Sequence, residues 1–343
     1  STKIGYFSDG KEILEETIRH SNEELAPYSS IAEQYEFRKN IIIETLKKHD
    51  ISVKSLDAVV GRGGLLHPIP GGTYEVSEKM KEDLASAKYG EHASNLGAII
   101  ADSIAKSLGK PAFIADPVVV DEMDDVARIA GNKLFTRKSI FHALNQKAVA
   151  KRYANEVGKN YNELNLIIAH LGGGISVGLH KMGRVVDVNN ALDGEGPFSP
   201  ERSGTLPAGD LAKLCFSGKY TLNDIKKIIK GNGGMVSYRN TNDLRDVRKD
   251  VENGDKEARL YYDAMTYQVS KEIGALAAAA EGKVDAIILT GGIAHNELFT
   301  NAVKNRVAWI ADFIVYPGED EITALYDAAV AVLAGKETAQ KYD

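Results

Sequence analysis

A triple glycine that interrupts two apolar runs is the sequence feature that most constrains this fold. It lies in the stretch AHLGGGISVGLHKMGRVV, residues 169–186. The runs IIAHL before it and ISVGL after it are typical of strands, and HKMGR then turns the chain into a third run, VVDV. The glycines therefore predict a hairpin bend. Such a bend predicts either an anion-binding concavity, because glycine lets backbone N–H groups approach a ligand, or a tight turn that only needs positive φ.

The two halves of the chain begin alike and continue with the same order of elements. Aligning residues 1–13 with 174–186 pairs Gly5 with Gly178 and Gly10 with Gly183. The expected elements are a helix near 30–48, the strand LDAVV, a helix near 91–108 and the strand PAFIA, then a helix near 256–281, the strand VDAIIL, a helix near 297–310 and the strand FIVY. A strand meander followed by alternating helices and strands predicts an α/β layer, and its duplication predicts two lobes with a cleft between them. We expect one lobe over residues 1–120, joined by a C-terminal helix at 322–343, and a nucleotide-binding lobe over 121–321.

Composition excludes several classes of function. The formal net charge of −6 over 343 residues argues against a nucleic-acid partner, because such proteins usually carry a basic surface. The single cysteine, Cys215, cannot form an internal disulfide, which favours a reducing, cytoplasmic location. No apolar run approaches the length of a membrane span, so we expect no membrane partner.

Chemically useful residues follow several of the expected strands. Arg62 follows LDAVVG, Asp116 follows PAFIA, Gly291 and Gly292 follow VDAIILT, and Glu321 comes shortly after FIVYPGED. Ligands of α/β sheets collect at the carboxyl ends of strands, so these residues predict a phosphate and metal site. The alternatives are a helix cap for Asp116 and a solvated helix start for Glu321. The Walker and dinucleotide-binding glycine patterns are both absent, so any phosphate binding is expected at hairpins.

The motifs of the chain resemble those of the superfamily of sugar kinases, actin and heat-shock chaperones, and within it the acetate kinase branch. The matching strings, in the family's order, are GRGGLLHPIPGG, GEHASNLGAI, IADPVVVDEM, SIFHALNQKAV, AHLGGGIS, DGEGPFSPERSGTLP and LTGGIAHN. The resemblance implies two duplicated ribonuclease H-like lobes around an ATP cleft. It also implies reversible, direct in-line phosphoryl transfer from ATP to a short-chain aliphatic carboxylate, which gives an acyl phosphate and ADP, and it implies a homodimer.

The resemblance also assigns roles to individual residues. Arg62 and Arg202 would flank the phosphoryl group and the substrate carboxylate, His142 and His170 would hydrogen-bond the phosphates, and Asp116 and Glu321 would position Mg²⁺. Residues matching the ATP site are Ser1, Lys3, Gly172, Gly173, Gly174, Ser176, Asp243, Leu244, Arg245, Gly291, Gly292 and Ile293. Candidates for the substrate pocket are Gly64, Leu65, Leu66, His92 and Phe141.

This chemistry suits the residue types. A carboxylic acid is already ionised at neutral pH, so the nucleophile needs no general base, and catalysis reduces to positioning and charge neutralisation. Two arginines and a magnesium ion would supply the positive charge. Magnesium prefers one or two carboxylates together with waters and phosphate oxygens, which Asp116 and Glu321 match.

The chain departs from the family pattern at two places. The family's N-terminal loop reads Asn-Pro-Gly-Ser-Thr-Ser-Thr-Lys, whereas the printed sequence starts at STK; Ser1 and Lys3 fit the end of the loop, and we expect the sequence to be incomplete at its start. Acetate-type members tend to have a branched residue where Gly64 lies. Its missing side chain predicts room for an acyl chain longer than acetate, with butyrate ahead of isobutyrate, propionate and acetate.

Two other functions remain open from the sequence. A sugar or glycerol kinase would need a carboxylate base, which Asp116 could supply, but it would not explain the two arginines. A non-catalytic, ATP-gated two-lobed binding protein would not need cations at the transferred phosphate.

Overall fold

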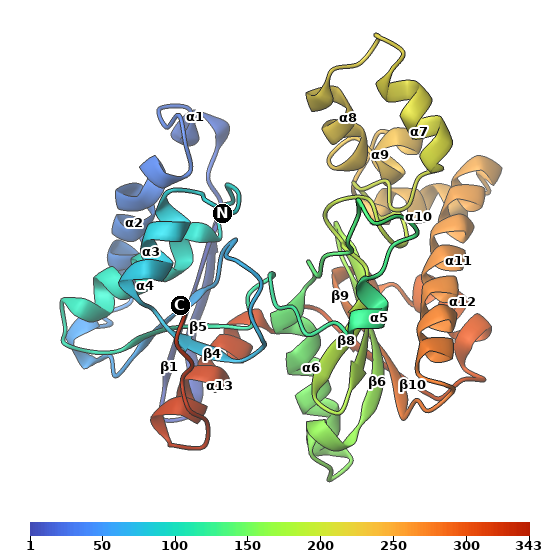
Figure 1. Cartoon of the computed structure of the whole chain (residues 1–343). Coiled ribbons are helices and arrows are strands. Elements are labelled where there is room, and N and C mark those ends of the chain that lie inside the picture. Colours follow the sequence, from blue (N-terminus) through green and yellow to red (C-terminus); the bar gives the residue numbers. More distant parts are fainter. The chain divides into compact units, whose positions relative to one another are not determined.

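The structure is a computed structural model that describes residues 1–343, apart from the side chain of Asn22. Its internal contacts divide the chain into two units, which we call unit 1 (Ser1–Val120 and Asp320–Asp343) and unit 2 (Asp121–Glu319). Both units contain helices and strands (Figure 1). None of the described helices is both long enough and apolar enough to span a membrane.

Unit 1 contains two small sheets and the helices that pack on them. Its elements are β1 (Thr2–Ser8), β2 (Lys11–Ile18), α1 (Asn22–Leu25), η1 (Ala32–Gln34), α2 (Tyr35–Lys48), η2 (Val53–Ser55), β3 (Val59–Arg62), β4 (Thr73–Glu75), α3 (Glu78–Ala85), α4 (Asn95–Lys106), β5 (Ala112–Ala115) and α13 (Glu321–Leu333). β1 and β2 form an antiparallel hairpin, and β5 lies between a parallel β3 and an antiparallel β4. The expected apolar face of α4 is buried through Leu96, Ile100 and Ile104, because these residues recur on one side of the helix.

The C-terminal segment is helical only in its first part. The apolar pattern predicts a last helix over about 321–335, which α13 matches by ending at Leu333, whereas the assignment of all of 322–343 to this helix is wrong. The following chain lies along β4, where the backbone N–H of Glu75 donates to the carbonyl of Gln340 at 3.0 Å. Tyr342 is buried and its hydroxyl donates to Asp83 Oδ2 at 2.9 Å. These contacts fix the tail in an extended form, which the helical periodicity of the sequence did not reveal.

Unit 2 contains one five-stranded mixed sheet. Its elements are α5 (Asp125–Arg128), α6 (Ala143–Glu156), η3 (Tyr161–Glu163), β6 (Asn165–Leu171), β7 (Ile175–Lys181), β8 (Arg184–Val188), α7 (Ala208–Cys215), α8 (Leu222–Ile229), α9 (Gly234–Arg239), α10 (Leu244–Glu252), α11 (Lys256–Ala279), β9 (Ala286–Gly291), η4 (Gly292–His295), α12 (Glu297–Val307) and β10 (Asp312–Pro317). The strand order is β10-β9-β6-β7-β8. β10, β9 and β6 are parallel, and β6, β7 and β8 form the expected antiparallel meander.

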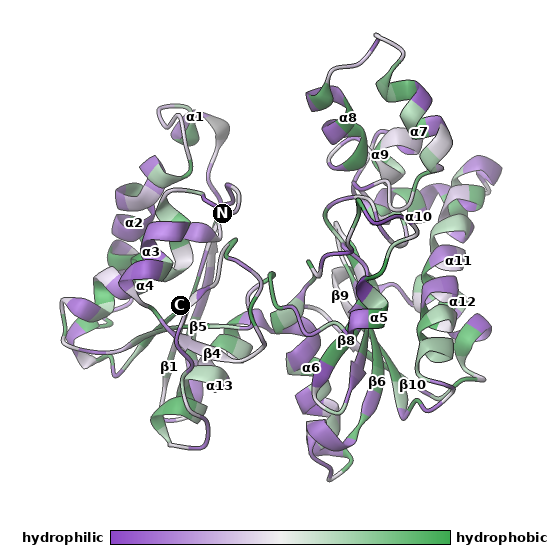
Figure 2. Ribbon diagram, viewed as in Figure 1, coloured by the Kyte–Doolittle hydropathy of each residue, from purple (hydrophilic) through white to green (hydrophobic). Residues whose placement is uncertain are grey.

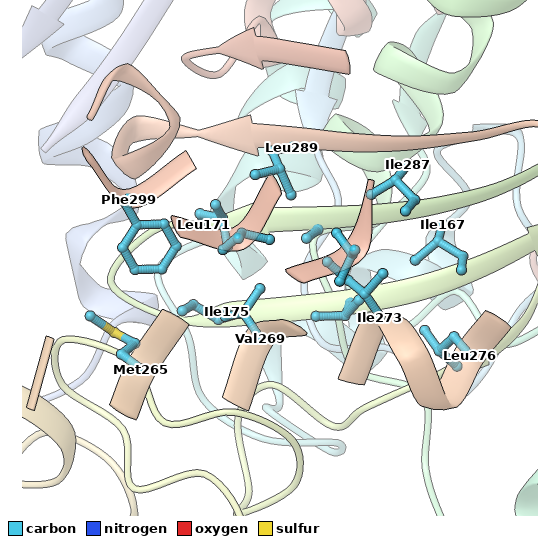
Figure 3. Close-up of a cluster of buried hydrophobic side chains, with 14 of the residues drawn as sticks. Ile167, Leu171, Ile175, Met265, Val269, Ile273, Leu276, Ile287, Leu289 and Phe299 are labelled. Carbon is cyan, nitrogen blue, oxygen red and sulfur yellow. The ribbon is translucent and has the colours of Figure 1, made fainter. Parts of the chain in front are cut away.

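Helices cover both faces of this sheet, and the alternation of β6 decides which residues face which helix. Ile167 and Leu171 pack with the apolar residues of α11, as Figure 3 shows, whereas Leu166 and Ile168 pack with Val149 of α6. Figure 2 shows that the strands of unit 2 are mostly hydrophobic, as expected for a sheet buried on both faces. His170 has the same parity as Leu166 and Ile168, so its side chain lies on the α6 face.

Candidate phosphate-binding site

The triple glycine forms the bend between β6 and β7. The backbone N–H of Gly172 donates to the carbonyl of Gly174 at 3.1 Å, and Ser199 Oγ donates to the carbonyl of Gly173 at 2.6 Å. None of these three glycines has a positive φ, so the interpretation of the bend as a turn that needs positive φ is wrong. A Cβ on Gly174 would instead overlap the guanidinium of Arg202. The glycine is needed because a cationic side chain lies directly against the backbone.

Arg202 is a largely buried cation with few partners. Its Nη1 donates to the carbonyl of Ala191 at 2.5 Å, and its Nε is buried without a hydrogen-bond partner among the described residues. Burial lowers the pKa of the Arg202 guanidinium, and the neighbouring Glu201 carboxylate offsets this only in part. A buried donor without an acceptor is costly, so the site favours a ligand that brings negative charge to the bend.

Two stacked histidines lie beside the glycine bend. The rings of His142 and His170 are parallel within 7° with their centroids 3.7 Å apart. His170 Nε2 is 3.1 Å from Glu319 Oε1, and its Nδ1 is 3.2 Å from Asn145 Oδ1. A Cβ on Gly172 would lie 3.1 Å from His170 Nε2, so this histidine also borders the bend. The structure therefore brings both predicted histidines, the three glycines and Arg202 together in unit 2.

Ser176 lies beneath the bend. Its side chain is fully buried, and its hydroxyl contacts His142 Nδ1 and Gln146 Nε2, each at 2.8 Å. The sequence predicted that Ser176 lines the phosphate pocket. Its hydroxyl is engaged by His142, which precedes α6, and by Gln146 of α6, because even-numbered residues of β7 point toward that helix. The role of Ser176 toward phosphate stays a prediction.

The predicted adenosine segments are also placed in unit 2. Gly291 ends β9 with φ +89°, and its Cβ position is occupied by the backbone of Leu171; Gly292 follows with open space around its Cβ position, and Ile293 is half-buried. Asp243 caps α10 by accepting from the backbone N–H of Arg245 at 2.9 Å. The hydrogen bonds from Arg245 lower the pKa of Asp243 to about 2. Leu244 is part of the hydrophobic core, and the side chain of Arg245 is exposed.

Unit 1 brings together Arg62 and Glu321. Arg62 ends β3, Glu321 begins α13, and Arg62 Nη2 lies 3.0 Å from Glu321 Oε1. β3 approaches α4 through Gly61 and Gly97, where a Cβ on either residue would overlap the backbone of the other element. This close packing fixes the backbone that carries Arg62.

Asp116 follows β5 in an uncommon backbone conformation. Its φ is +36°, and its Oδ1 accepts from the backbone N–H of Gly72 at 2.8 Å. Strained backbone of this kind often marks functional sites. The described residues contain no group of three metal-ligating side chains. A magnesium ion that keeps its waters and phosphate ligands needs only one or two carboxylates, so Asp116 and Glu321 fit this donor set.

The structure corrects the reason given for Gly64. A Cβ on Gly64 would lie 2.6 Å from Asn95 Cα and 2.8 Å from Leu84 Cδ2. The missing side chain therefore makes room for α4, and the prediction that it enlarges an acyl pocket is wrong. Leu66 belongs to the core of unit 1, while Leu65 is half-buried with its backbone N–H donating to Asn95 Oδ1 at 2.9 Å.

Four other predicted residues have identifiable surroundings. His92 is exposed and its Nδ1 pairs with Ser94 Oγ at 2.8 Å, and Phe141 is buried in unit 2. The carbonyl of Ser1 accepts from Arg38 Nη1 at 2.8 Å, and Lys3 Nζ lies 2.9 Å from Glu15 Oε1. Ser1 and Lys3 thus lie at the start of the β1–β2 hairpin.

Sequence reasoning missed Asn145, Gln146, His180 and Glu319. Asn145 and Gln146 follow His142 by three and four residues, which places all three on one face of α6 and could have been recognised in the string FHALNQ. Glu319 and His180 gave no such signal, because their contacts depend on strand pairing between distant segments.

A mixed sheet that carries a glycine bend, a buried arginine and paired histidines defines an α/β protein with a candidate anion-binding site. The family model described as the Acetokinase family matches residues 125–312. The chain belongs to the acetokinase family. Butyrate kinases 2 and 1 of Clostridium acetobutylicum are each 59% identical to it over 342 residues, which is 100% of this chain and 96% of either relative.

Solved structures agree with the fold. Acetate kinase of Porphyromonas gingivalis has a TM-score of 0.73 at 20% identity, over 95% of this chain and 88% of that one. Acetate kinase of Entamoeba histolytica has a TM-score of 0.69 at 18% identity, over 96% and 91% of the two chains. The predicted fold class and family are thereby confirmed.

Proposed function

We propose that this chain transfers the γ-phosphoryl group of ATP to the carboxylate of butyrate and so forms butyryl phosphate and ADP. In the transfer a carboxylate oxygen attacks the γ-phosphorus, and the bond from that phosphorus to the bridging oxygen of ADP breaks. The observation that carries the proposal is the buried guanidinium of Arg202, which lies against the glycine bend with its Nε unpartnered. Relatives named butyrate kinase support the choice of acceptor.

The site suits an acceptor that is already an anion. A carboxylate needs no general base, but bringing it to a negatively charged phosphate requires compensating positive charge. Arg202 would supply that charge at the glycine bend, and the resemblance to the family assigns a second such cation to Arg62. His142 would donate a hydrogen bond to a phosphate oxygen, and His170 would do so by exchanging its contact with the Glu319 carboxylate for a phosphate oxygen. The backbone of residues 172–174 would approach the phosphates closely because no side chain intervenes.

Magnesium and adenosine also have partners in the proposal. Asp116 and Glu321 would hold the ion, which when bound neutralises phosphate charge. Gly292 would allow a ligand to approach closely, because the space around its Cβ position is open. Leu244 anchors the start of α10 in the core, and the capping pair of Asp243 and Arg245 fixes the backbone that would border the adenosine.

A cytoplasmic homodimer is also part of the proposal. Four large apolar side chains of unit 2, Val126, Ile129, Leu134 and Phe135, are each at least 68% exposed, which is unusual for a surface that meets only water. The single cysteine, Cys215, is free and exposed, which suits a reducing compartment. Light scattering after size-exclusion chromatography would measure the assembly directly.

The proposed activity is tested by trapping acyl phosphates as hydroxamates in the presence of Mg²⁺ and ATP. Acetate, propionate, butyrate, isobutyrate and valerate would be compared, with glucose and glycerol as hydroxyl acceptors and ADP release as the common readout. We expect the highest kcat/KM with butyrate. ADP release that depends on a sugar or on glycerol, with no hydroxamate from any acid, would contradict the proposal.

A further inference from the structure

A buried chain of hydrogen bonds runs beneath the phosphate site in unit 2. It connects Tyr161, His180, Gln146, Ser176 and His142 in that order. Tyr161 Oη lies 2.7 Å from His180 Nδ1, His180 Nε2 lies 2.9 Å from Gln146 Oε1, Gln146 Nε2 lies 2.8 Å from Ser176 Oγ, and Ser176 Oγ lies 2.8 Å from His142 Nδ1. Gln146, Ser176 and His180 are fully buried.

One contact of Gln146 fixes the orientation of its amide. Its Nε2 is 3.1 Å from the backbone carbonyl of Ser176, and a carbonyl oxygen can only accept. The amide nitrogen must therefore face Ser176 and the amide oxygen must face His180. It follows that His180 carries a proton on Nε2.

The protonation of His180 determines the direction of its hydrogen bond with Tyr161. Burial lowers the pKa of His180 to about 3, and the nearby charge of Lys147 acts in the same direction, so the imidazole is neutral. A neutral imidazole with a proton on Nε2 has an acceptor at Nδ1. Tyr161 therefore donates its hydroxyl proton to His180.

The hydroxyl of Ser176 donates its hydrogen bond to the side chain of His142. Its oxygen accepts from Gln146 Nε2 and, at 3.4 Å, from the backbone N–H of His142. With both lone pairs engaged, the hydroxyl proton makes the 2.8 Å contact to His142 Nδ1. His142 Nδ1 is then an acceptor, and an imidazole whose Nδ1 accepts carries its proton on Nε2.

We propose that Gln146 and His180 are positioning residues that, through Ser176, hold His142 in the tautomer with its proton on Nε2. This inference rests on the proposed function, in which His142 donates a hydrogen bond to a phosphate oxygen. The opposite tautomer would present a lone pair to that oxygen, and so replace an attraction with a repulsion. Loss of one such donor typically lowers kcat by roughly 10²–10³-fold.

The glycine in the middle of β7 supports the same network. A Cβ on Gly178 would lie 2.7 Å from Gln146 Oε1 and 3.5 Å from His180 Nε2. Its φ is not positive, so the backbone does not require glycine at this position. Glycine weakens a strand interior, and here its missing side chain makes room for the amide that orients the chain of hydrogen bonds.

The variant Gln146→Glu tests the proposal, because a carboxylate can accept from His180 but cannot donate to Ser176. The hydroxyl of Ser176 would turn to the carboxylate, and His142 would then have to donate from Nδ1. Proton–nitrogen correlation spectra of protein labelled with ¹⁵N-histidine, recorded near pH 8, report the tautomer, with His142 assigned from His142→Gln. The wild type should show the proton on Nε2, and Gln146→Glu should show it on Nδ1.

Kinetics with ATP and butyrate accompany the spectra. We expect Gln146→Glu to lower kcat about 10²-fold and to leave both KM values within about twofold, because substrate binding does not require the proton. Gln268→Glu is the matched control: Gln268 only accepts, from the backbone N–H of Phe198 at 3.1 Å, so a carboxylate can replace it. This control should keep the wild-type kcat and the His142 tautomer.

Each outcome decides the proposal. Wild-type His142 with its proton on Nδ1 would overturn it, and this measurement does not depend on the folding of Gln146→Glu. An unchanged His142 tautomer in folded Gln146→Glu, with the introduced carboxyl shown by its ¹³C shift to be ionised, would also overturn it, as would an inverted tautomer with full kcat. A switch of tautomer in a protein that phosphorylates no acid would support the network and count against the proposed function instead.

Discussion

Replacement of Arg202 by methionine should separate the role of this residue in phosphoryl transfer from its role in the stability of the fold. Arg202 donates to the carbonyl of Ala191 at 2.5 Å, and its buried Nε has no partner. Methionine keeps much of the apolar volume and removes the charge. We therefore expect Arg202→Met to abolish most of the phosphoryl transfer with only a small change in the stability of the fold.

The expected loss of activity follows from the position of the guanidinium. Because this group occupies the place where a Gly174 side chain would lie, a phosphate on the bend would be in direct contact with it. Two unit charges about 4 Å apart attract by about 4 kcal/mol at an effective dielectric constant of about 20. Since about 1.4 kcal/mol corresponds to a tenfold change in rate, kcat should fall about 10³-fold, the lower end of the range known for transition-state arginines.

The expected change in stability is small, because two effects oppose each other. Removing the unsatisfied Nε gains about 1–3 kcal/mol, and leaving the buried carbonyl of Ala191 without its donor costs a similar amount, so the free energy of unfolding should stay within about 2 kcal/mol of the wild type. Inorganic phosphate binding to the bend should stabilise the wild type by about 2.7 kcal/mol at a hundred times its Kd, and should stabilise the variant much less. Urea unfolding with and without phosphate measures both effects.

Arg239→Met is the matched control in the same unit. Arg239 is mostly covered, like Arg202, but it donates to Asp250 at 2.8 Å and to Asp255 at 2.7 Å. This variant should lower the urea midpoint and keep the wild-type kcat. If Arg202→Met instead lost stability to the same extent as the control, with kcat within tenfold of wild type, Arg202 would be a structural residue and the reasoning would be refuted.

Three further predictions concern stability. Gly64→Ala should lower the free energy of unfolding by about 1–3 kcal/mol through overlap with Asn95, and should leave the ratio of kcat/KM for butyrate and acetate unchanged. Tyr342→Phe should lower the urea midpoint, because the buried carboxylate of Asp83 loses a donor at 2.9 Å; an equal midpoint would show that the C-terminal tail does not stabilise unit 1. Asp243→Asn keeps the helix cap but removes the charge. Because the pKa of Asp243 is lowered to about 2, the stabilisation of the fold by its carboxylate is complete above the unfolded pKa of about 3.9 and is lost as the pH falls toward 2. The difference in urea midpoint between the wild type and Asp243→Asn should therefore narrow below about pH 4.

The order of strands and helices could be predicted because apolar periodicity is a local property of the chain. α4, α11 and α12 lie within a few residues of their expected ranges. The expected strand LDAVV starts later, at Val59, because a short 3₁₀ helix over Val53–Ser55 precedes it and ladder pairing with β5 begins only there. Strand partners were not predictable in unit 1, since β3 pairs with β5 across more than forty intervening residues.

The candidate site was predictable where a local string of residues carries it. The glycine bend, His170 and Arg202 share one region of unit 2, as the resemblance to the acetate kinase branch implied. The contacts of His180 and Ser176 were not predictable, because they depend on which face of β7 meets α6. A sequence shows that such residues are polar, but their tautomers and donors depend on neighbours that only the folded chain brings together.

Gly64 shows why an absent side chain is weak evidence for an empty space. The notion of a larger acyl pocket assumed that the vacated volume is open, whereas Asn95 and Leu84 occupy it. Of the predicted pocket residues in unit 1, Leu66 lies in the core, and Leu65 is half-buried against the same asparagine. Asn95 also fixes the position of Leu65, so the glycine contributes to this loop by letting it pack closely on α4.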